Sequence, residues 1–336
     1  MIDEIFYSGY KSINLDSMVW IVSTQRTGSS NLCEALSSFN SRDFVCPRMC
    51  ETVFPFICVN RLFDFLEWFF AIIGRDFDAD ISVIMKKVSG VNEDSTDHHP
   101  MTFYSCSQPE HVHAQWQQIS PVSQFTIPNI DYFKKVSLFT ELPPRAYEMM
   151  DMIRYKVMQK VSYRRGQGKV VVFKAHSSED LTQMAKRFPH AKFIIGHRRP
   201  SQQIPSAIEL VNSFQMSMSG TSCYHRDWID ERISYMGRLW KAEFDFYTSD
   251  DVSSDRKMSV PFNYFMKQPE EVLLSVYDFL GMKRDQHITN CISKYYEEHK
   301  AYKGERKYKN PKLEELGYNA EDIDGQYEYY VKRFNL

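Results

Sequence analysis

A short run of small, polar and cationic residues near the N-terminus has the composition of an anion-binding loop. The run reads Thr24-Gln-Arg-Thr-Gly-Ser-Ser-Asn-Leu32. Gly28 allows the backbone to approach a ligand closely, and Arg26 offers a bidentate positive charge. Hydroxyl donors flank the glycine: Thr27, Ser29 and Ser30. Residues of these types, in this order, suit a phosphate group.

The elements on either side of this loop strengthen the prediction. Residues 18–24 are short, apolar and β-branched, which predicts a buried strand. Residues Asn31–Phe39 are expected to form a helix. Free backbone N–H groups at the start of a helix point at a ligand there, and the helix dipole adds positive potential. We therefore expect a phosphate cradle between the strand and the helix.

The same loop argues against one common class of nucleotide enzyme. The pattern GxxxxGK[ST] of nucleotide triphosphatases needs a lysine before the hydroxyl pair, and this loop has none. An ATPase or kinase is therefore disfavoured. On this segment alone, a Ser/Thr-rich turn carrying a surface arginine remains the alternative.

A second strand-to-helix junction carries arginine and serine at a suggestive spacing. The predicted strand Lys192–Gly196 is followed by His197-Arg-Arg-Pro200 and then by a helix beginning near Ser201. Arg198 and Ser206 lie eight residues apart and could converge on one phosphate, because ligands bind at the carboxyl ends of parallel strands. Taken alone, a helix start with solvent-facing arginines is the more ordinary interpretation.

The alternation of elements predicts the fold class. Buried strands at 18–24, Lys169–Lys174 and Lys192–Gly196 alternate with amphipathic segments, which indicates βαβ units and a parallel sheet covered by helices on both faces. The segments expected to be helical are 31–39, 61–73, 145–163, 178–187, 201 to beyond 209, 269–280 and 320–334. We expect an α/β three-layer sandwich forming a single domain over 1–336. Residues 88–130, rich in Ser, Gln, His and Pro, are expected to be a lid or acceptor-binding insertion.

Composition excludes several functional classes. The chain has 336 residues with 41 Lys+Arg against 43 Asp+Glu, a net charge of −2, so a strongly basic nucleic-acid binder is not expected. Seven cysteines without a CxxC pair argue against a metal site and for reduced thiols. Charged residues interrupt the N-terminus and the apolar stretch Val53–Gly74, so neither a signal peptide nor a membrane span is expected. These observations favour a cytoplasmic protein with a small-molecule partner.

Together the two junctions resemble the cofactor motifs of sulfotransferases that use 3′-phosphoadenosine 5′-phosphosulfate (PAPS). In that family an Arg/Lys-[ST]-G-[ST]-[ST] loop holds the 5′-phosphosulfate, and an Arg…Ser pair spaced by eight holds the 3′-phosphate. The matching residues here are Arg26 to Ser30, with Asn31 next to them, and Arg198 with Ser206. The resemblance implies a P-loop-like fold and PAPS as the sulfuryl donor, with no metal.

Further segments extend the resemblance, which is closest to the branch that includes tyrosylprotein and bacterial-type sulfotransferases. Val171–His176, Phe188–Pro200, Ser259–Met282 and Tyr308–Tyr318 resemble family blocks in order along the chain. The departures are Phe262-Asn263 in place of a Tyr-Glu pair and Arg199 in place of an aspartate. The block around Lys174 is one residue shorter, so its histidine could correspond to His176 or Ser177.

The resemblance also implies how the transfer would be catalysed. Sulfuryl transfer needs positively charged side chains beside the moving group, and it needs stabilisation of the negative charge on the departing phosphate oxygen. Arg26 and Lys174, both at predicted strand ends, take this role in the family branch. For Lys174 the alternative is a lysine that snorkels from a strand end.

The reaction also needs a base for the acceptor, and more than one residue could take this role. Glu51 stands at the place of the family's glutamate, and burial would raise its pKa so that it could accept the acceptor's proton. A structural or surface glutamate is the alternative. Histidines compete for the role: His176, His197, His111 and His113. A basic cluster in the tail comprises Lys303, Arg306, Lys307 and Lys309. It is expected to be a solvated face, with closure over the cofactor phosphates as the alternative.

The sequence therefore predicts an enzyme that moves a sulfuryl group from PAPS to a hydroxyl or amine of a small molecule, with a specialised metabolite as the first expectation. Two alternatives stay open: a P-loop-like nucleotide or small-molecule kinase, and a non-catalytic nucleotide-binding protein on the same fold. The oligomeric state is not predicted.

Overall fold

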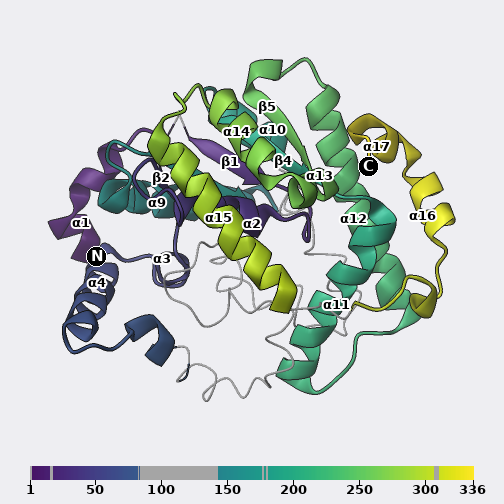
Figure 1. Ribbon diagram of the computed structural model, residues 1–336, viewed down its shortest axis with the longest axis horizontal. Coiled ribbons are helices and arrows are strands. Elements are labelled where there is room, and N and C mark those ends of the chain that lie inside the picture. The colour runs from purple at the N-terminus through teal and green to yellow at the C-terminus, as the bar shows by residue number, and fades with distance from the viewer. Residues whose placement is uncertain are drawn as a thin grey trace.

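The computed structural model describes residues 2–15, 18–81, 83, 143–175, 178, 181–305 and 310–336. Its centre is a five-stranded sheet in the order β2-β3-β1-β4-β5, in which every pair is parallel (Figure 1). The strands are β1 (Val19–Val22), β2 (Phe44–Val45), β3 (Val170–Ala175), β4 (Lys192–His197) and β5 (Lys257–Pro261). The predicted parallel sheet is confirmed. The segment predicted as a lid, 88–130, lies outside the described residues.

Helices surround this sheet and join its strands. They are α1 (Ile2–Phe6), α2 (Ser29–Ser37), α3 (Met49–Val53), α4 (Ile57–Ile72), α9 (Pro144–Arg165), α10 (Leu181–Arg187), α11 (Pro200–Ser219), α12 (Arg226–Thr248), α13 (Phe262–Lys267), α14 (Pro269–Phe279), α15 (Gln286–Glu305), α16 (Ala320–Gln326) and α17 (Glu328–Phe334). Within the described part of the chain, no helix is long and apolar enough to cross a membrane.

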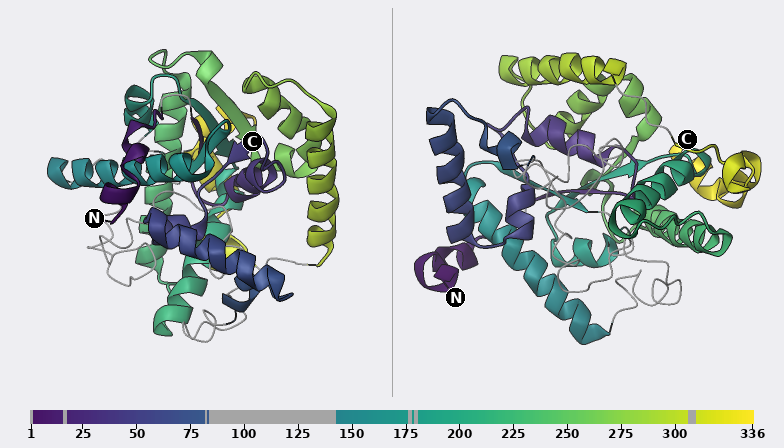
Figure 2. Two further views of the ribbon diagram at one scale, coloured as in Figure 1. Left: turned by 90° about the vertical axis from the view of Figure 1, so that its left-hand side faces the viewer. Right: turned by 90° about the horizontal axis from the view of Figure 1, so that it is seen from below.

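Alternating strand residues build the two interior layers. Val19 and Ile21 of β1 face a core with α2, α14 and α15, whereas Trp20 and Val22 face a core with α9 and α10. Successive side chains of a strand point to opposite faces, so a fully apolar strand fits a sheet covered on both sides. Figure 2 (right) shows α2, α14 and α15 on one side of the sheet and α9 and α10 on the other. The predicted α/β three-layer architecture is confirmed.

Several element boundaries differ from those predicted. The helix expected over 320–334 is two helices, α16 and α17, which meet at Tyr327. The long helices α12 and α15 are absent from the sequence predictions. Helix α12 carries charged residues along its whole length, which masks the buried row of Trp228, Ile233, Met236 and Trp240.

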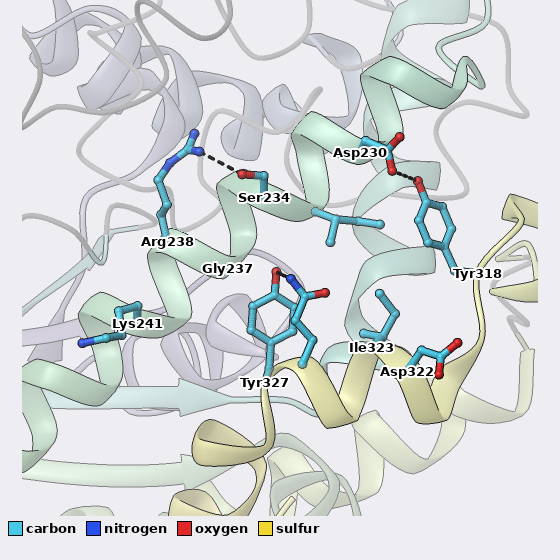
Figure 3. A pocket seen from close by; sticks show the side chains of 11 residues that line it. Asp230, Ser234, Gly237, Arg238, Lys241, Tyr318, Asp322, Ile323 and Tyr327 are labelled. Carbon is cyan, nitrogen blue, oxygen red and sulfur yellow. Dashed lines mark hydrogen bonds between the residues drawn. The ribbon is translucent and has the colours of Figure 1, made fainter.

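The C-terminal segment packs on α12 at the right-hand edge of the molecule in Figure 1. The ring of Tyr327 lies edge-on to Trp240, with 4.7 Å between the ring centroids. A pocket of about 590 Å³ opens beside it between α12 and α16, where Tyr318 donates a hydrogen bond of 2.5 Å to Asp230 (Figure 3). The tip of Tyr327 comes so close to Gly237 that a Cβ added there would lie 2.5 Å from the tyrosine oxygen.

This close contact makes Gly237→Ala a test of how tightly the C-terminal segment is packed. Alanine favours a helix over glycine by about 1 kcal/mol, whereas overpacking costs about 1–3 kcal/mol. We expect the free energy of unfolding, measured in urea, to fall. Gly325→Ala in α16 is the matched control, because an added Cβ there meets nothing within 4 Å. Equal stabilisation by both substitutions would contradict tight packing of Tyr327.

Candidate active site at the carboxyl ends of the strands

The loop after β1 has the backbone geometry of an anion cradle. Gly28 precedes the first residue of α2 and has a φ of +81°, in the left-handed region that suits glycine. Arg26 also has a positive φ, +71°, which is uncommon for a residue with a side chain. The turn directs the free N–H groups at the start of α2 toward the carboxyl edge of the sheet. An unusual φ at such an edge is typical of a functional loop.

The two junctions predicted as separate phosphate sites lie against each other. Arg26 Nε donates a hydrogen bond of 2.8 Å to Ser206 Oγ on α11. Arg198, just past β4, donates one of 3.1 Å to the backbone carbonyl of Arg26. Phe262, at the start of α13, packs on both junctions. Its ring lies 4.4 Å from the Arg198 guanidinium, and a Cβ added to Gly28 would come within 3.1 Å of the same ring. Arg26, Arg198 and Ser206 therefore form one site.

Arg198 has a positive charge without an acidic partner among the described residues. Burial and, to a smaller extent, the like charge of Arg26 together lower the pKa of Arg198 to about 10. Among the described residues, no carboxylate lies within 4 Å of the Arg198 guanidinium, and its buried Nε has no hydrogen-bond partner. Two neighbouring guanidiniums repel each other, so an anion bound between them would be stabilised by both.

A lysine reaches the same loop from the neighbouring strand. Lys174 of β3 is 1% exposed, and its Nζ donates a hydrogen bond of 3.1 Å to Ser30 Oγ in α2. A buried ammonium that points at the start of a helix adds charge where an anion would sit. The side chain of Lys174 is therefore directed into the protein and does not snorkel to solvent.

Thr27 is placed differently from the other residues of the loop. Its buried hydroxyl has no hydrogen-bond partner in the described part of the chain, and a Cβ added to Gly196 of β4 would lie 2.9 Å from it. The side chain thus faces the sheet, so the backbone of Thr27 is the part that borders the cradle. Hydroxyl donation by Thr27 to a ligand stays a prediction.

Glu51 is buried in an ionic cluster at the end of α9. Its carboxylate is 2% exposed and accepts hydrogen bonds from Arg164 and Arg165, including 2.6 Å from Arg165 Nη2 to Oε2. The backbone N–H of Arg48 adds one of 2.8 Å. Burial by itself would raise the pKa of Glu51, but the two guanidiniums and the backbone N–H outweigh it and lower the pKa to about 2. The raised pKa expected from the sequence is wrong in direction; the role of Glu51 as base stays a prediction.

The partners of Glu51 also place it relative to Lys174. Arg165 is the last residue of α9, and a Cβ on the following Gly166 would lie 3.1 Å from Val171 near the start of β3. Lys174 is three residues further along that strand, a rise of about 10 Å. The Arg165 side chain nevertheless extends to the end of β2, where its Nη2 donates a hydrogen bond of 2.6 Å to the carbonyl of Cys46. The charges of Arg165 and Lys174 both act to lower the pKa of the buried Cys46 thiol, so both cations lie near that residue.

Of the candidate histidines, His197 lies within the described part of the chain and His176, His111 and His113 lie outside it. His197, the last residue of β4, is fully buried, stacks on Phe334 at 3.6 Å and shares a hydrogen bond of 2.9 Å with the Tyr330 hydroxyl. Burial lowers its pKa. Other predicted residues lie outside the part of the chain that the structure describes: His176, Ser177, His111, His113, and the tail residues Arg306, Lys307 and Lys309.

Sequence reasoning missed two residues that shape the site. Phe262 was noted only as a departure from the family pattern, yet it packs on Gly28 and Arg198. Glu243, in the middle of α12, accepts hydrogen bonds at the start of the cradle loop. A charged residue between the aromatic residues Trp240 and Phe244 on a buried helix is a signal for such a role.

The described residues also bear on metal binding. Among them, no three His, Cys, Asp or Glu side chains gather as they would around a metal ion. The expectation of a metal-free reaction stays a prediction.

An all-parallel sheet with a cationic loop and a second arginine at its carboxyl ends defines an α/β protein with an edge suited to an anionic ligand. A sequence model described as "Sulfotransferase family" matches residues 19–286. The chain therefore belongs to the sulfotransferase family, and the resemblance found in its motifs is confirmed.

Solved structures agree with this assignment at the level of the fold. Sulfotransferase STF9 from Mycobacterium avium superposes with a TM-score of 0.70 at 13% identity, over 98% of this chain and 80% of that one. Sulfotransferase STF1 from Mycobacterium tuberculosis H37Rv gives a TM-score of 0.63 at 14% identity, over 96% and 79%. No curated protein matches the chain significantly. The P-loop-like α/β fold is thereby confirmed.

The ionic cluster predicts a pH-dependent stability. The pKa of Glu51 is lower in the folded state than its ordinary value of 4.5, so its contribution is complete above about pH 4.5 and is lost as the pH falls toward 2. Glu51→Gln should reduce the free energy of unfolding by about 3–5 kcal/mol at pH 7, because it leaves Arg165 without its acidic partner and the buried Arg164 with Asp64 alone. The loss should shrink at pH 3.5, as urea unfolding at both pH values would show.

Asp64→Asn is the matched control for this cluster. Asp64 also pairs with Arg164, but its side chain is 42% exposed, so its removal should cost about 1 kcal/mol or less. Equal losses in both variants, or a loss in Glu51→Gln that does not depend on pH, would contradict this account of Glu51.

Proposed function

We propose that this protein transfers a sulfuryl group from PAPS to a hydroxyl or amine of a small-molecule acceptor. The observation that carries the proposal is the pair Arg26 and Arg198, held together at the ends of β1 and β4 beside Ser206. The pair lacks a carboxylate partner at Arg198 among the described residues, so a ligand with negative charges is the natural complement.

Two groups of residues would hold the donor. Arg198 and Ser206 would bind the 3′-phosphate, because a buried guanidinium with a vacant Nε is suited to a phosphate oxygen. The loop from Arg26 to Asn31 would bind the 5′-phosphosulfate through the N–H groups at the start of α2. Phe262, which covers both groups, would border the nucleoside between them.

Catalysis would then rest on charge and position. The sulfuryl group carries its charge on peripheral oxygens, and the bond to the phosphate oxygen breaks as the acceptor oxygen or nitrogen attacks in line, as in phosphoryl transfer. Lys174 and Arg26 would stabilise the negative charge that develops on that departing oxygen. Burial of Lys174 strengthens this interaction, since water screens it less.

The acceptor's proton needs a base, and Glu51 and His176 are the candidates. A carboxylate whose pKa is about 2 is a weak base, so Glu51 would act only on a proton that has become strongly acidic late in the transfer. A histidine would instead have to be neutral before transfer begins. The two candidates therefore predict different pH profiles.

The proposal extends to the location, the partners and the acceptor of the enzyme. We propose a cytoplasmic enzyme with no nucleic-acid partner, in keeping with the net charge of −2. A specialised metabolite as acceptor rests on the unusual composition of 88–130. A screen of hydroxyl- and amine-bearing compounds with labelled PAPS would identify the acceptor.

Donor binding is the first test. At about 100 times its Kd, adenosine 3′,5′-bisphosphate should stabilise the folded protein by about 2.7 kcal/mol, whereas ATP and AMP should do less at the same concentration. Thermal unfolding measures this shift. Arg198→Ala should abolish it. Arg199→Ala is the control, because Arg199 is bound to Asp324 and the carbonyl of Leu336 instead.

Four results would contradict parts of the proposal. A shift with ATP alone would favour the kinase alternative, and no shift with the bisphosphate would reject PAPS. Equal loss in Arg198→Ala and Arg199→Ala would reject the assigned phosphate site. Binding of the bisphosphate without sulfuryl transfer to any acceptor would favour the non-catalytic alternative over an enzyme.

The base is tested by kinetics once an acceptor is known. If Glu51 is the base, Glu51→Gln should lower kcat about 10²–10⁴-fold while the folded fraction still binds the bisphosphate. The wild-type kcat/KM should then stay constant as the pH is lowered from 8 to 5. A fall below about pH 6.5 would point to a histidine, and normal turnover by Glu51→Gln would reject the assignment.

A further inference from the structure

A buried carboxylate that belongs to neither phosphate site lies directly behind the cradle. Glu243 of α12 is 0% exposed. Its Oε1 accepts hydrogen bonds from Thr24 N–H at 2.6 Å, from Thr24 Oγ1 at 2.7 Å and from Ser178 Oγ at 2.6 Å. Its Oε2 accepts one of 2.6 Å from the Tyr330 hydroxyl, and His197 Nδ1 lies 3.5 Å away. Every oxygen of the carboxylate is thus engaged.

These partners come from the ends of three neighbouring strands. Thr24 lies two residues after β1, Ser178 three residues after β3, and His197 is the last residue of β4. Tyr330 belongs to α17 at the C-terminus. One carboxylate therefore ties together the strand ends that surround the candidate site and the last helix of the chain.

Thr24 is the point at which the loop leaves the sheet. The preceding residue, Ser23, still pairs with the sheet through a hydrogen bond of 3.2 Å to the carbonyl of Ala175 in β3. The N–H of Thr24 has Glu243 as its acceptor, and a buried N–H without an acceptor is costly. Two residues later comes Arg26 with its positive φ. The direction in which the cradle loop starts therefore depends on where Glu243 lies.

Neighbouring groups keep this carboxylate ionised. Among the described residues, no lysine or arginine lies within 4 Å of Glu243. Burial would raise its pKa, but the nearby His197 and the hydrogen bonds from Ser178 and Tyr330 outweigh burial and lower it. Hydrogen bonds to an ionised acceptor are about twice as strong as those between neutral groups. The charge thus gives these contacts the strength to fix the loop.

From these contacts we infer that Glu243 is a positioning residue for the donor cradle: it fixes the start of the loop 24–30 and links the position of α17 to it through Tyr330. The identity of the ligand rests on the proposed function. A carboxylate that only stabilised the fold would change the fraction of folded protein, whereas a positioning residue changes the affinity of the folded fraction.

Glu243→Gln tests the inference with almost no change of shape. Titration calorimetry with adenosine 3′,5′-bisphosphate gives the Kd and the number of competent sites separately. We expect a Kd about tenfold higher with an unchanged number of sites per folded protein. Tyr330→Phe, which removes one donor and keeps the ring, should raise the Kd in the same direction by about threefold, a smaller change because three hydrogen bonds remain.

Amide hydrogen exchange tests the same inference without a ligand. In Glu243→Gln, the amides of residues 24–28 should exchange at least tenfold faster than in the wild type. Two variants serve as controls: Leu273→Ala, a buried core residue of α14 whose loss lowers stability, and Asp245→Asn, an exposed carboxylate on α12. Neither should change the Kd or the exchange of this loop selectively.

The outcomes separate the inference from the proposed function. Wild-type protein that does not bind the bisphosphate rejects the proposed donor, and the exchange experiment still decides the role of Glu243. A normal Kd with fewer competent sites in Glu243→Gln would overturn the inference, as would faster exchange spread over the whole chain as in Leu273→Ala. An effect on loop exchange without any effect of Tyr330→Phe would remove the link to α17.

Discussion

Two guanidinium groups held side by side at the ends of β1 and β4 are the feature on which the rest of the candidate site depends. Arg26 and Arg198 are joined by a hydrogen bond from one guanidinium to the other residue's backbone, and Arg198 has no carboxylate partner among the described residues. Such a pair is unfavourable in the absence of a counter-ion, since two like charges repel more strongly where water is excluded. The parallel sheet nevertheless brings both strand ends, and the start of α2, to one edge. The unfavourable pair is therefore evidence for an anionic ligand, whereas the same arginines on a solvated surface would carry no such information.

The positive groups are kept in place by uncharged contacts and by a carboxylate that lies behind the loop, away from the ligand. Phe262 packs on Gly28 and on the Arg198 guanidinium, and Gly196 leaves room for Thr27 to turn its hydroxyl toward β4. Glu243 lies on the other side of the loop, where it holds Thr24. A carboxylate placed between the two arginines would have neutralised them. Behind the loop, it orders the backbone and leaves the arginines available, because its oxygens are saturated by N–H and O–H donors.

The sequence was sufficient for the parts of the structure that depend on local pattern. The three apolar strands β1, β3 and β4 and the helix after the cradle follow from short segments, whereas the described hydrogen bond of Ser206 comes from Arg26, 180 positions away. The parts that depend on contacts between distant residues were not predictable: Thr24 and Glu243 are 219 positions apart, and Glu51 and Arg165 are 114 apart. The pKa of Glu51 is the clearest example. Burial could be expected from the sequence, but the two arginines that reverse its effect come from the end of another helix.

The comparison between Glu51 and the cradle shows how one chain keeps two sets of buried charges separate. Arg164 and Arg165 share the carboxylate of Glu51, and Arg48 pairs with Asp64 and Glu67, so each of these arginines is compensated by the protein itself. An anion that approached them would have to displace an existing carboxylate. At the cradle, Arg198 has no carboxylate within 4 Å among the described residues, and it lies beside Arg26, whose backbone carbonyl accepts its hydrogen bond. An anion that binds Arg198 displaces no carboxylate of this described set, so the placement of acidic partners, more than the number of basic residues, favours this edge of the sheet for a highly charged donor.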